Sequence, residues 1–184
     1  MRDRDGLDKN PLVSMQALEA LHAQLFGWSL SRCGYDRMAA EDLMQQAYVE
    51  ILSGRARFDD KSSLKTFMFG VVQMLAKTRF RKLKSMLRLV DAVAANAENA
   101  AATLLSVDDD RSRMVWLAVQ ALPARQRDMT ELVFCREMTI EDASSVMGVS
   151  TGTGRVHYDR AKKTLARTLS GLQPELETAG DQYA

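Results

Sequence analysis

The chain has 184 residues, of which 46% are hydrophobic and 27% charged, a balance typical of a globular protein with its own core. The 3 Pro and 10 Gly are too few for an all-β sandwich, and no apolar stretch approaches the roughly 18 residues of a membrane span. The net charge is only +1, but acids and bases are segregated along the chain.

The two cysteines, Cys33 and Cys135, lie far apart, and no Cys or His stands at ligand spacing. We therefore expect reduced thiols in a cytoplasmic protein, with no disulfide framework, no metal site and no cofactor. The first residues mix charges of both signs without an apolar run, so we expect neither a signal peptide nor membrane insertion.

The first half of the chain predicts three helices. Apolar residues recur at steps of three and four over about 12–31 and about 38–53, and Gly34 and Gly54 follow as stop signals. A longer helix is predicted from Ser63, a suitable N-cap, and its apolar line continues into a segment of bases. This basic segment contains no acid, and its members are Lys77, Arg79, Arg81, Lys82, Lys84 and Arg88.

The second half predicts a helix-turn-helix. A short helix from about 112 to 122 precedes a second helix that has Pro123 in its first turn. Thr139 opens a third with a capping-box-like start, and Gly148 is a natural left-handed stop. Ser150 then caps a basic helix that is predicted to end near residue 169. A short helix, a tight turn and a longer basic helix form this motif's outline.

The predicted fold class is therefore all-α, with two small helical domains joined by a linker. The N-terminal helical bundle spans 10–85 and the C-terminal helix-turn-helix domain spans 112–170. Residues 86–111 are rich in Ala and Asp and repeat no large side chain at a core-forming period, which favours a linker. The remaining residues, 171–184, form an acidic tail.

Two segments resemble one known family. The sequences AEDLMQQAYVEIL at 40–52 and SLKTFMFGVVQMLAKTRFRK at 63–82 resemble the first conserved domain of bacterial sigma factors. The segment 121–169, with LPxRQR, GxSxGTxR and RAKKTL, resembles their C-terminal domain. The presence of these two domains alone, with a short linker, is the layout of the extracytoplasmic-function (ECF) sigma factors.

The resemblance implies a function without catalysis. Such a factor binds core RNA polymerase, directs it to promoter DNA with a −10 and a −35 element, and is commonly held inactive by an anti-sigma factor. The residues themselves favour no enzyme, because the chain has no Gly-rich phosphate loop, no His-Cys cluster and no nucleophile–base spacing. The alternative is a sigma-like mimic that titrates an anti-sigma factor without recognising promoters.

The resemblance also assigns the surfaces of the N-terminal domain. Asp42, Gln45 and Gln46, with Tyr48 one turn on, match the positions that grip the polymerase, although an acid is usual at position 46. The −10 element is expected at Lys77, Arg79, Arg81 and Lys82, with the loop 57–63 holding an extruded base. Met74, Thr78 and Phe67 depart from the usual residues there. Solvated helix faces remain the alternative for both surfaces.

The last helix is expected to read the −35 element. If Gly154, Tyr158, Ala161 and Leu165 face inward, the outward side chains are Arg155, Val156, Asp159, Arg160 and Lys163. Arg155 and Arg160 are suited to guanine, while Asp159 either accepts a hydrogen bond from cytosine N4 or pairs with Arg155 at i,i+4 spacing. Gly154 is expected to weaken the start of this helix by about 1 kcal/mol.

Overall fold

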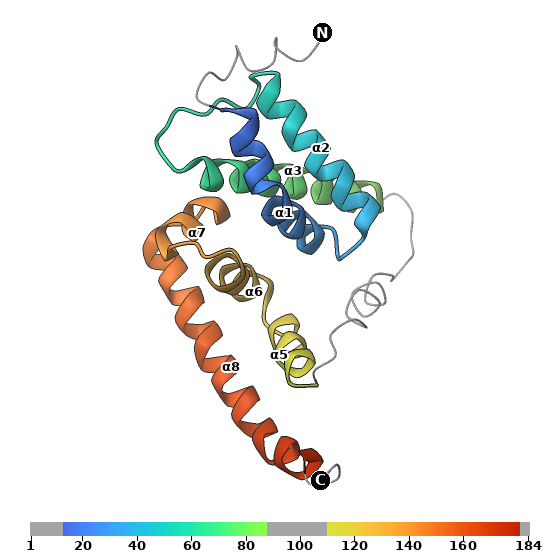
Figure 1. The fold of residues 1–184 in the computed structure, drawn as a ribbon, viewed down its shortest axis with the longest axis vertical. Coiled ribbons are helices and arrows are strands. Elements are labelled where there is room, and N and C mark those ends of the chain that lie inside the picture. Colours follow the sequence, from blue (N-terminus) through green and yellow to red (C-terminus); the bar gives the residue numbers. More distant parts are fainter. Residues whose placement is uncertain (1–12, 88–109, 181–184) are drawn as a thin grey trace. The chain divides into compact units, whose positions relative to one another are not determined.

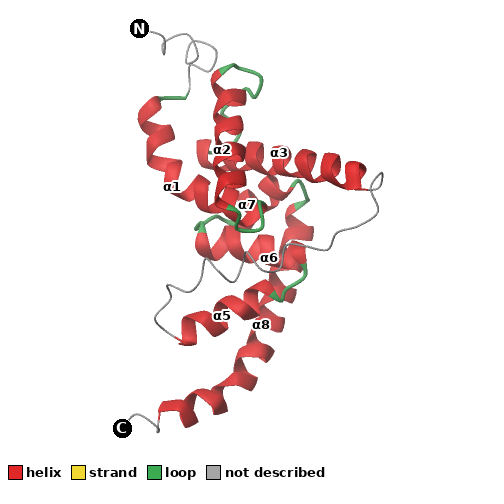
Figure 2. Ribbon diagram, turned by 90° about the vertical axis from the view of Figure 1, so that its right-hand side faces the viewer, coloured by secondary structure: helices red, strands yellow, loops and turns green. Residues whose placement is uncertain are grey.

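The computed structural model describes residues 13–87 and 110–180, and every regular element in these ranges is helical (Figures 1 and 2). The chain divides into two compact units, which we call unit 1 (residues 1–103) and unit 2 (residues 104–184). The predicted all-α, two-domain architecture is therefore confirmed. Residues 88–109, which make up most of the predicted linker, lie outside the described residues. Within the described ranges, no helix is both long enough and apolar enough to cross a membrane.

Unit 1 is a bundle of three helices, α1 (Met15–Arg32), α2 (Arg37–Leu52) and α3 (Leu64–Leu87), each of which contacts the other two. Side-chain oxygens cap all three helix starts. Ser14 accepts from Ala17 N at 3.2 Å, Asp36 from Ala39 N at 3.0 Å, and Ser63, as predicted, from Thr66 N at 3.1 Å. The largest side chains of the core are Trp28, Phe69, Leu25, Leu43, Ile51 and Met68.

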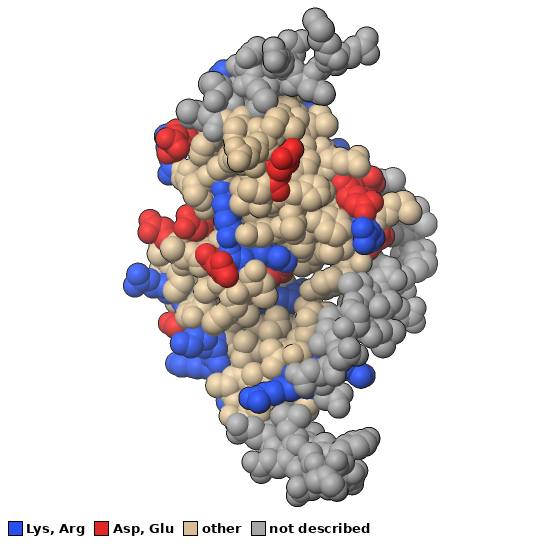
Figure 3. Space-filling model, in the orientation of Figure 1, with Lys and Arg blue, Asp and Glu red and all other residues tan. Residues whose placement is uncertain are grey.

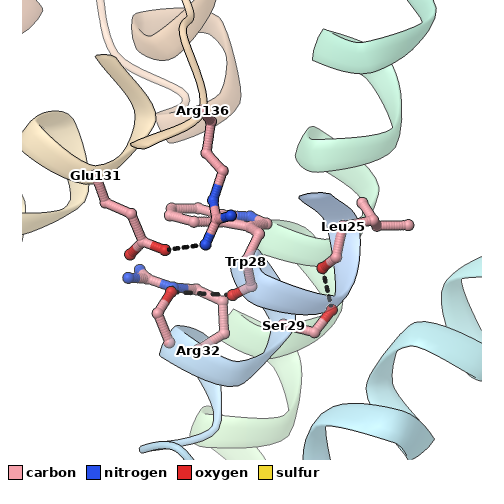
Figure 4. A network of polar contacts seen from close by, with 7 residues as sticks. Leu25, Trp28, Ser29, Arg32, Glu131 and Arg136 are labelled. Carbon is pink, nitrogen blue, oxygen red and sulfur yellow. Dashed lines mark hydrogen bonds and ion pairs between the residues drawn. The ribbon is translucent and has the colours of Figure 1, made fainter. Parts of the chain in front are cut away.

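Trp28 packs the end of α1 against α3. Its indole ring lies 6.0 Å from the ring of Phe69 on α3. The guanidinium of Arg32 lies over the indole ring, 4.1 Å from its centroid (Figure 4). Ser29 is fully buried and satisfies its hydroxyl by donating to the Leu25 carbonyl at 2.9 Å. The buried tryptophan thus joins α1 to α3 without leaving the adjacent serine unpaired.

Unit 2 consists of α5 (Asp110–Gln120), α6 (Ala124–Thr130), the π-helical turn η2 (Glu131–Cys135), α7 (Ile140–Met147) and α8 (Thr151–Gly180). Helix α8 contacts α5, α6 and α7. Helix α5 begins two residues before the predicted start, and α8 continues to Gly180 instead of ending near residue 169. The core includes Leu122, Met129, Leu132, Ala143, Met147 and Ala161.

The helix-turn-helix forms at the predicted residues. The Thr139 hydroxyl accepts from Asp142 N at 3.0 Å and donates to the Asp142 carboxylate at 2.7 Å, which caps α7. Gly148 ends α7 with φ of 68°, a left-handed conformation that suits glycine, and Val149 N donates to the Ser144 carbonyl at 3.0 Å. Ser150 then accepts from Thr153 N at 3.2 Å and starts α8.

The turn η2 was not predicted. Helix α6 runs directly into it, and Arg136 N donates to the Glu131 carbonyl at 3.1 Å, five residues back. The same spacing brings the side chains together, since Arg136 Nη2 lies 3.1 Å from Glu131 Oε1 in a largely buried ion pair (Figure 4). A π-helical turn therefore replaces the expected α-helical register at this position.

Gly154 is a point of close approach between helices. A Cβ at this position would lie 1.9 Å from Ser144 Oγ and 3.0 Å from Met129 Cε. Ser144 cannot easily turn away, because it is buried and its hydroxyl donates to the Ile140 carbonyl at 2.5 Å. The expected weakening by Gly154 is therefore only part of the account: glycine is also what allows α8 to pack against α7 and α6.

A comparison of two glycines in α8 tests this contact. Gly154→Ala should destabilise unit 2 by about 1–2 kcal/mol, because overpacking outweighs the gain in helix propensity. Gly152→Ala is the matched control, since a Cβ there meets nothing within 4 Å. It should be neutral or stabilising by up to about 1 kcal/mol. Urea unfolding of the full chain, with hydrogen exchange resolved by peptide to assign the change to α6–α8, measures both.

The double variant Ser144→Ala/Gly154→Ala provides the internal check. Removing the hydroxyl relieves the worst overlap, so the two changes should be coupled by at least about 0.5 kcal/mol in a double-mutant cycle. Strict additivity, or a stabilising effect of Gly154→Ala alone, would contradict the close-approach account.

Candidate protein- and DNA-binding surfaces

The outer face of α2 carries the predicted polymerase-binding residues. Asp42, Gln45 and Gln46 are all exposed. The opposite face of α2 is buried through Leu43, Ala47 and Ile51, which are 1%, 0% and 0% exposed. The helix thus presents one carboxylate and two amides together to solvent, on a rigid support.

Tyr48 lies at the edge of this face and is half-buried. Its hydroxyl is 3.1 Å from His22 Nδ1 on α1, and the two rings stack with centroids 6.1 Å apart and planes 8° from parallel. Burial raises the pKa of the Tyr48 phenol above its usual value, so the group stays a neutral hydroxyl at physiological pH. Sequence reasoning does not connect His22 with Tyr48, because a contact between two helices leaves no local pattern.

The basic end of α3 is exposed, but its members have different surroundings. Arg79 Nη1 donates to the Ala39 carbonyl of α2 at 3.2 Å, and Arg81 Nη2 donates to Thr78 Oγ1 at 3.3 Å. Lys77 also has an interaction within the chain. Lys82 is exposed, and among the described residues no hydrogen bond or ion pair of its side chain is recorded. Of the four predicted residues, Lys82 is the one fully available to a ligand.

The loop before α3 is held at several points. Arg55 makes two hydrogen bonds to Glu50, at 2.7 and 3.1 Å, and this pairing lowers the pKa of the Glu50 carboxyl. Lys61 pairs with Asp59. Phe58 packs against Phe67, the residue that replaces the family's usual Trp, with ring centroids 5.2 Å apart. The connection between α2 and α3 is thus anchored to α2 through Arg55, and the predicted base-holding loop 57–63 within it is anchored to α3 through Phe58.

Both cysteines carry free thiols in the structure. Burial raises the pKa of the Cys33 thiol above its usual value, and the nearby Arg79 opposes this effect. The thiol form is therefore favoured at neutral pH, as for a residue that packs rather than reacts.

Helix α8 places all five predicted −35 residues on one exposed arc, formed by Arg155, Val156, Asp159, Arg160 and Lys163. The predicted inward line is also correct, because Gly154 and Ala161 are buried and Tyr158 and Leu165 are half-buried. In the described part of the chain no hydrogen bond or ion pair is recorded for the four charged side chains of the arc. Figure 3 shows Lys and Arg gathered along the edge where α8 lies.

An aromatic stack supports α8 from behind. The Tyr158 ring lies 5.8 Å from that of Phe134, a residue of the turn η2, and Lys162 Nζ lies 5.4 Å from the Tyr158 centroid. Phe134 is 57% exposed, and no pattern in the sequence singles it out. The extra residue of the π-helical turn changes which side chains point outward, and helical periodicity alone cannot anticipate that.

Comparison with known proteins identifies the family. A family model for Sigma-70 region 2 matches residues 18–86, and one for Sigma-70, region 4, matches residues 112–165. The ECF RNA polymerase sigma factor SigF of Caulobacter vibrioides is 26% identical over 89% of each chain. The RNA polymerase sigma factor CarQ of Myxococcus xanthus is 25% identical over 95% of this chain and 98% of its own.

The fold is also that of a solved structure. The sigma factor RpoE of Bartonella quintana, determined in complex with the anti-sigma factor NepR, is matched with a TM-score of 0.65 and 22% identity. The match covers 84% of this chain and 95% of that one.

The Arg79 contact leads to a prediction about stability. Arg79→Ala removes a hydrogen bond between α3 and α2 and should destabilise unit 1 by about 0.5–1.5 kcal/mol. Lys82→Ala, a control with the same loss of one positive charge on the same helix end, should change stability by less than about 0.5 kcal/mol. Urea unfolding with hydrogen exchange of α2 and α3 measures both. Equal effects of the two changes would show that the Arg79–Ala39 hydrogen bond does not stabilise unit 1.

The two matched regions lie in the two structural units in the same order and together cover more than half of the chain. The match to SigF extends over most of the length of both chains. The chain belongs to the ECF sigma factors of bacterial RNA polymerase.

Proposed function

We propose that this protein is an alternative sigma factor that binds core RNA polymerase and directs promoter-specific transcription initiation. The observation that carries the proposal is the exposed arc of α8, which follows a helix-turn-helix turn and presents base-reading side chains with no recorded partner within the described chain. A helix of this kind inserts its exposed face into the major groove. Family membership supports the same conclusion.

The polymerase would be held by the α2 face. Asp42, Gln45 and Gln46 offer acceptors, and a partner helix rich in Arg and Lys would supply donors with a complementary charge. Because Gln46 stands where an acid is usual in the family, the attraction should depend less on salt. Tyr48, fixed by His22, adds a rigid aromatic edge to the same face.

The two DNA contacts would differ in kind. The end of α3 concentrates cations without any acid in sequence, which suits the phosphates of the −10 region through counterion release. The α8 arc mixes cations with Val156 and Asp159, a combination that suits base edges at the −35 element. Phosphate contacts set position and affinity, while base contacts set specificity.

Regulation and location follow from the same role. The related RpoE was solved with an anti-sigma factor, and we propose that an anti-sigma factor also controls this protein. Core polymerase and promoter DNA place its action in the cytoplasm. The family acts by directing the polymerase, so no reaction of its own and no cofactor are required.

The sigma-like mimic is the second candidate. Such a protein would need only the surface that an anti-sigma factor recognises, and the basic end of α3 and the α8 arc would have no purpose in it. Transcription in vitro with purified core polymerase separates the two. Promoter-dependent transcripts support the sigma factor, whereas stable binding to an anti-sigma factor without any transcript would support the mimic.

A triple change on α2 tests polymerase binding. Asp42→Ala/Gln45→Ala/Gln46→Ala should weaken association with core polymerase while the fold stays intact, because exposed positions normally change stability by less than about 0.5 kcal/mol. Gln16→Ala/Glu19→Ala on the exposed side of α1 is the control, since it also removes an amide and a carboxylate. Affinity for core polymerase is measured by titration. An undiminished affinity of the folded triple variant would remove this assignment.

Two changes on α8 test −35 recognition. Arg155→Ala should reduce discrimination at one or two base pairs by roughly 1–3 kcal/mol, because a bidentate contact to guanine is lost. Lys163→Ala should weaken binding evenly across sequences and reduce its salt dependence, because a lysine on phosphate reads no base. Holoenzyme is titrated against single-base variants of the element at two salt concentrations. If Arg155→Ala also acts evenly on every variant, its role is a phosphate contact and Arg160 becomes the base-reading candidate.

A further inference from the structure

The α8 arc contains a single acid. Between residues 151 and 169, Asp159 is the only acidic residue, and it is exposed among Arg155, Arg160 and Lys163. A carboxylate in a surface that approaches DNA is repelled by the phosphates, so it weakens binding unless it gains a specific hydrogen bond. Its presence at the centre of the arc therefore requires an explanation.

An ion pair within the helix does not explain it. Arg155 and Lys163 stand four residues before and after Asp159, the spacing at which helical ion pairs form. Among the described residues no ion pair or hydrogen bond of the Asp159 carboxylate is recorded. By contrast, Arg37 and Glu41 at the same spacing on α2 do pair, with Nε and Oε1 2.9 Å apart. Of the two roles expected from the sequence, the Arg155 buttress is not formed.

The role that remains from the sequence analysis is to accept a hydrogen bond from a donor on a base. In the major groove, donors are offered only by cytosine N4 and adenine N6. Adenine places its N7 acceptor beside that donor, which repels the second carboxylate oxygen, whereas cytosine presents no acceptor there. Guanine and thymine present acceptors, which a carboxylate rejects.

We propose that Asp159 is a specificity-determining residue that selects cytosine at one position of the −35 element, with adenine second and guanine and thymine excluded. The inference rests on the proposed function, since it requires α8 to enter the groove. Arg155 lies four residues earlier on the same arc, about 6 Å along the axis, and so reaches the same or a neighbouring base pair. Cytosine selection and guanine selection thus occur side by side.

The experiment uses the full chain bound to core polymerase and a pool of duplex DNA in which both promoter elements are randomised. Wild-type holoenzyme should enrich a −35 sequence with cytosine at one position. Asp159→Asn should move that position to adenine, because an amide pairs with adenine N6 and N7. Asp159→Ala should leave the position unselected, with at least about a fivefold loss of discrimination in direct titrations.

A charge-matched control separates base reading from simple repulsion. Glu141→Gln removes one exposed carboxylate of unit 2 outside the arc, and it should leave the base preference at every position unchanged. The proposal is overturned if Asp159→Asn and Asp159→Ala raise affinity for all sequences alike, as Glu141→Gln would by charge alone. It is equally overturned if they leave the enriched sequence unaltered.

The wild-type selection separates this inference from the proposed function. If wild-type holoenzyme enriches no sequence at all, the proposed promoter recognition fails and the Asp159 assignment fails with it. If wild type enriches a defined element whose base preferences do not depend on residue 159, the sigma factor function stands and only the assignment of Asp159 is wrong.

Discussion

The packing of α8 against α7 and α6 at Gly154 determines what unit 2 can do. Because no side chain stands at this position, Ser144 and Met129 reach the α8 backbone, and the rotation of α8 about its own axis is set there. Ala161, two turns on, is buried on the same line. Once that line faces inward, the geometry of an α-helix places Arg155, Asp159 and Lys163 outward together. The proposed DNA binding by this unit thus depends on a contact in which none of the proposed DNA-reading residues takes part.

In unit 1, buried side chains likewise determine which face of a helix is exposed, and these side chains are larger. Leu43, Ala47 and Ile51 fill the core beneath α2, and the carboxylate and amides on its other face are presented as a consequence. The Arg79 contact to the Ala39 carbonyl adds a constraint between α3 and α2. A cation from the proposed −10 surface therefore also stabilises the helix that carries the proposed polymerase surface, and the two surfaces are not structurally independent.

Much of this organisation could be predicted from the sequence because it rests on local rules. Caps at Ser63, Thr139 and Ser150, the left-handed Gly148 and the periodic apolar lines need only neighbouring residues, and all are confirmed. The features that could not be predicted depend on residues far apart in the sequence or on an irregular helix. The His22–Tyr48 stack joins residues 26 positions apart, and the Glu131–Arg136 pair requires a π-helical register that a period of 3.6 does not contain. The steric need for Gly154 depends on where α7 passes, which propensity alone does not reveal.

The charged side chains of the α8 arc make no hydrogen bond or ion pair within the described chain, and this has an evolutionary consequence. Since its charged side chains hold nothing in place, each can be replaced without a compensating change elsewhere, whereas a side chain added at position 154 meets Ser144 and destabilises the packing of α8. Promoter preference can therefore diverge by single substitutions while the scaffold stays constant. After gene duplication, two copies of such a protein could acquire separate sets of target genes without passing through an unstable intermediate.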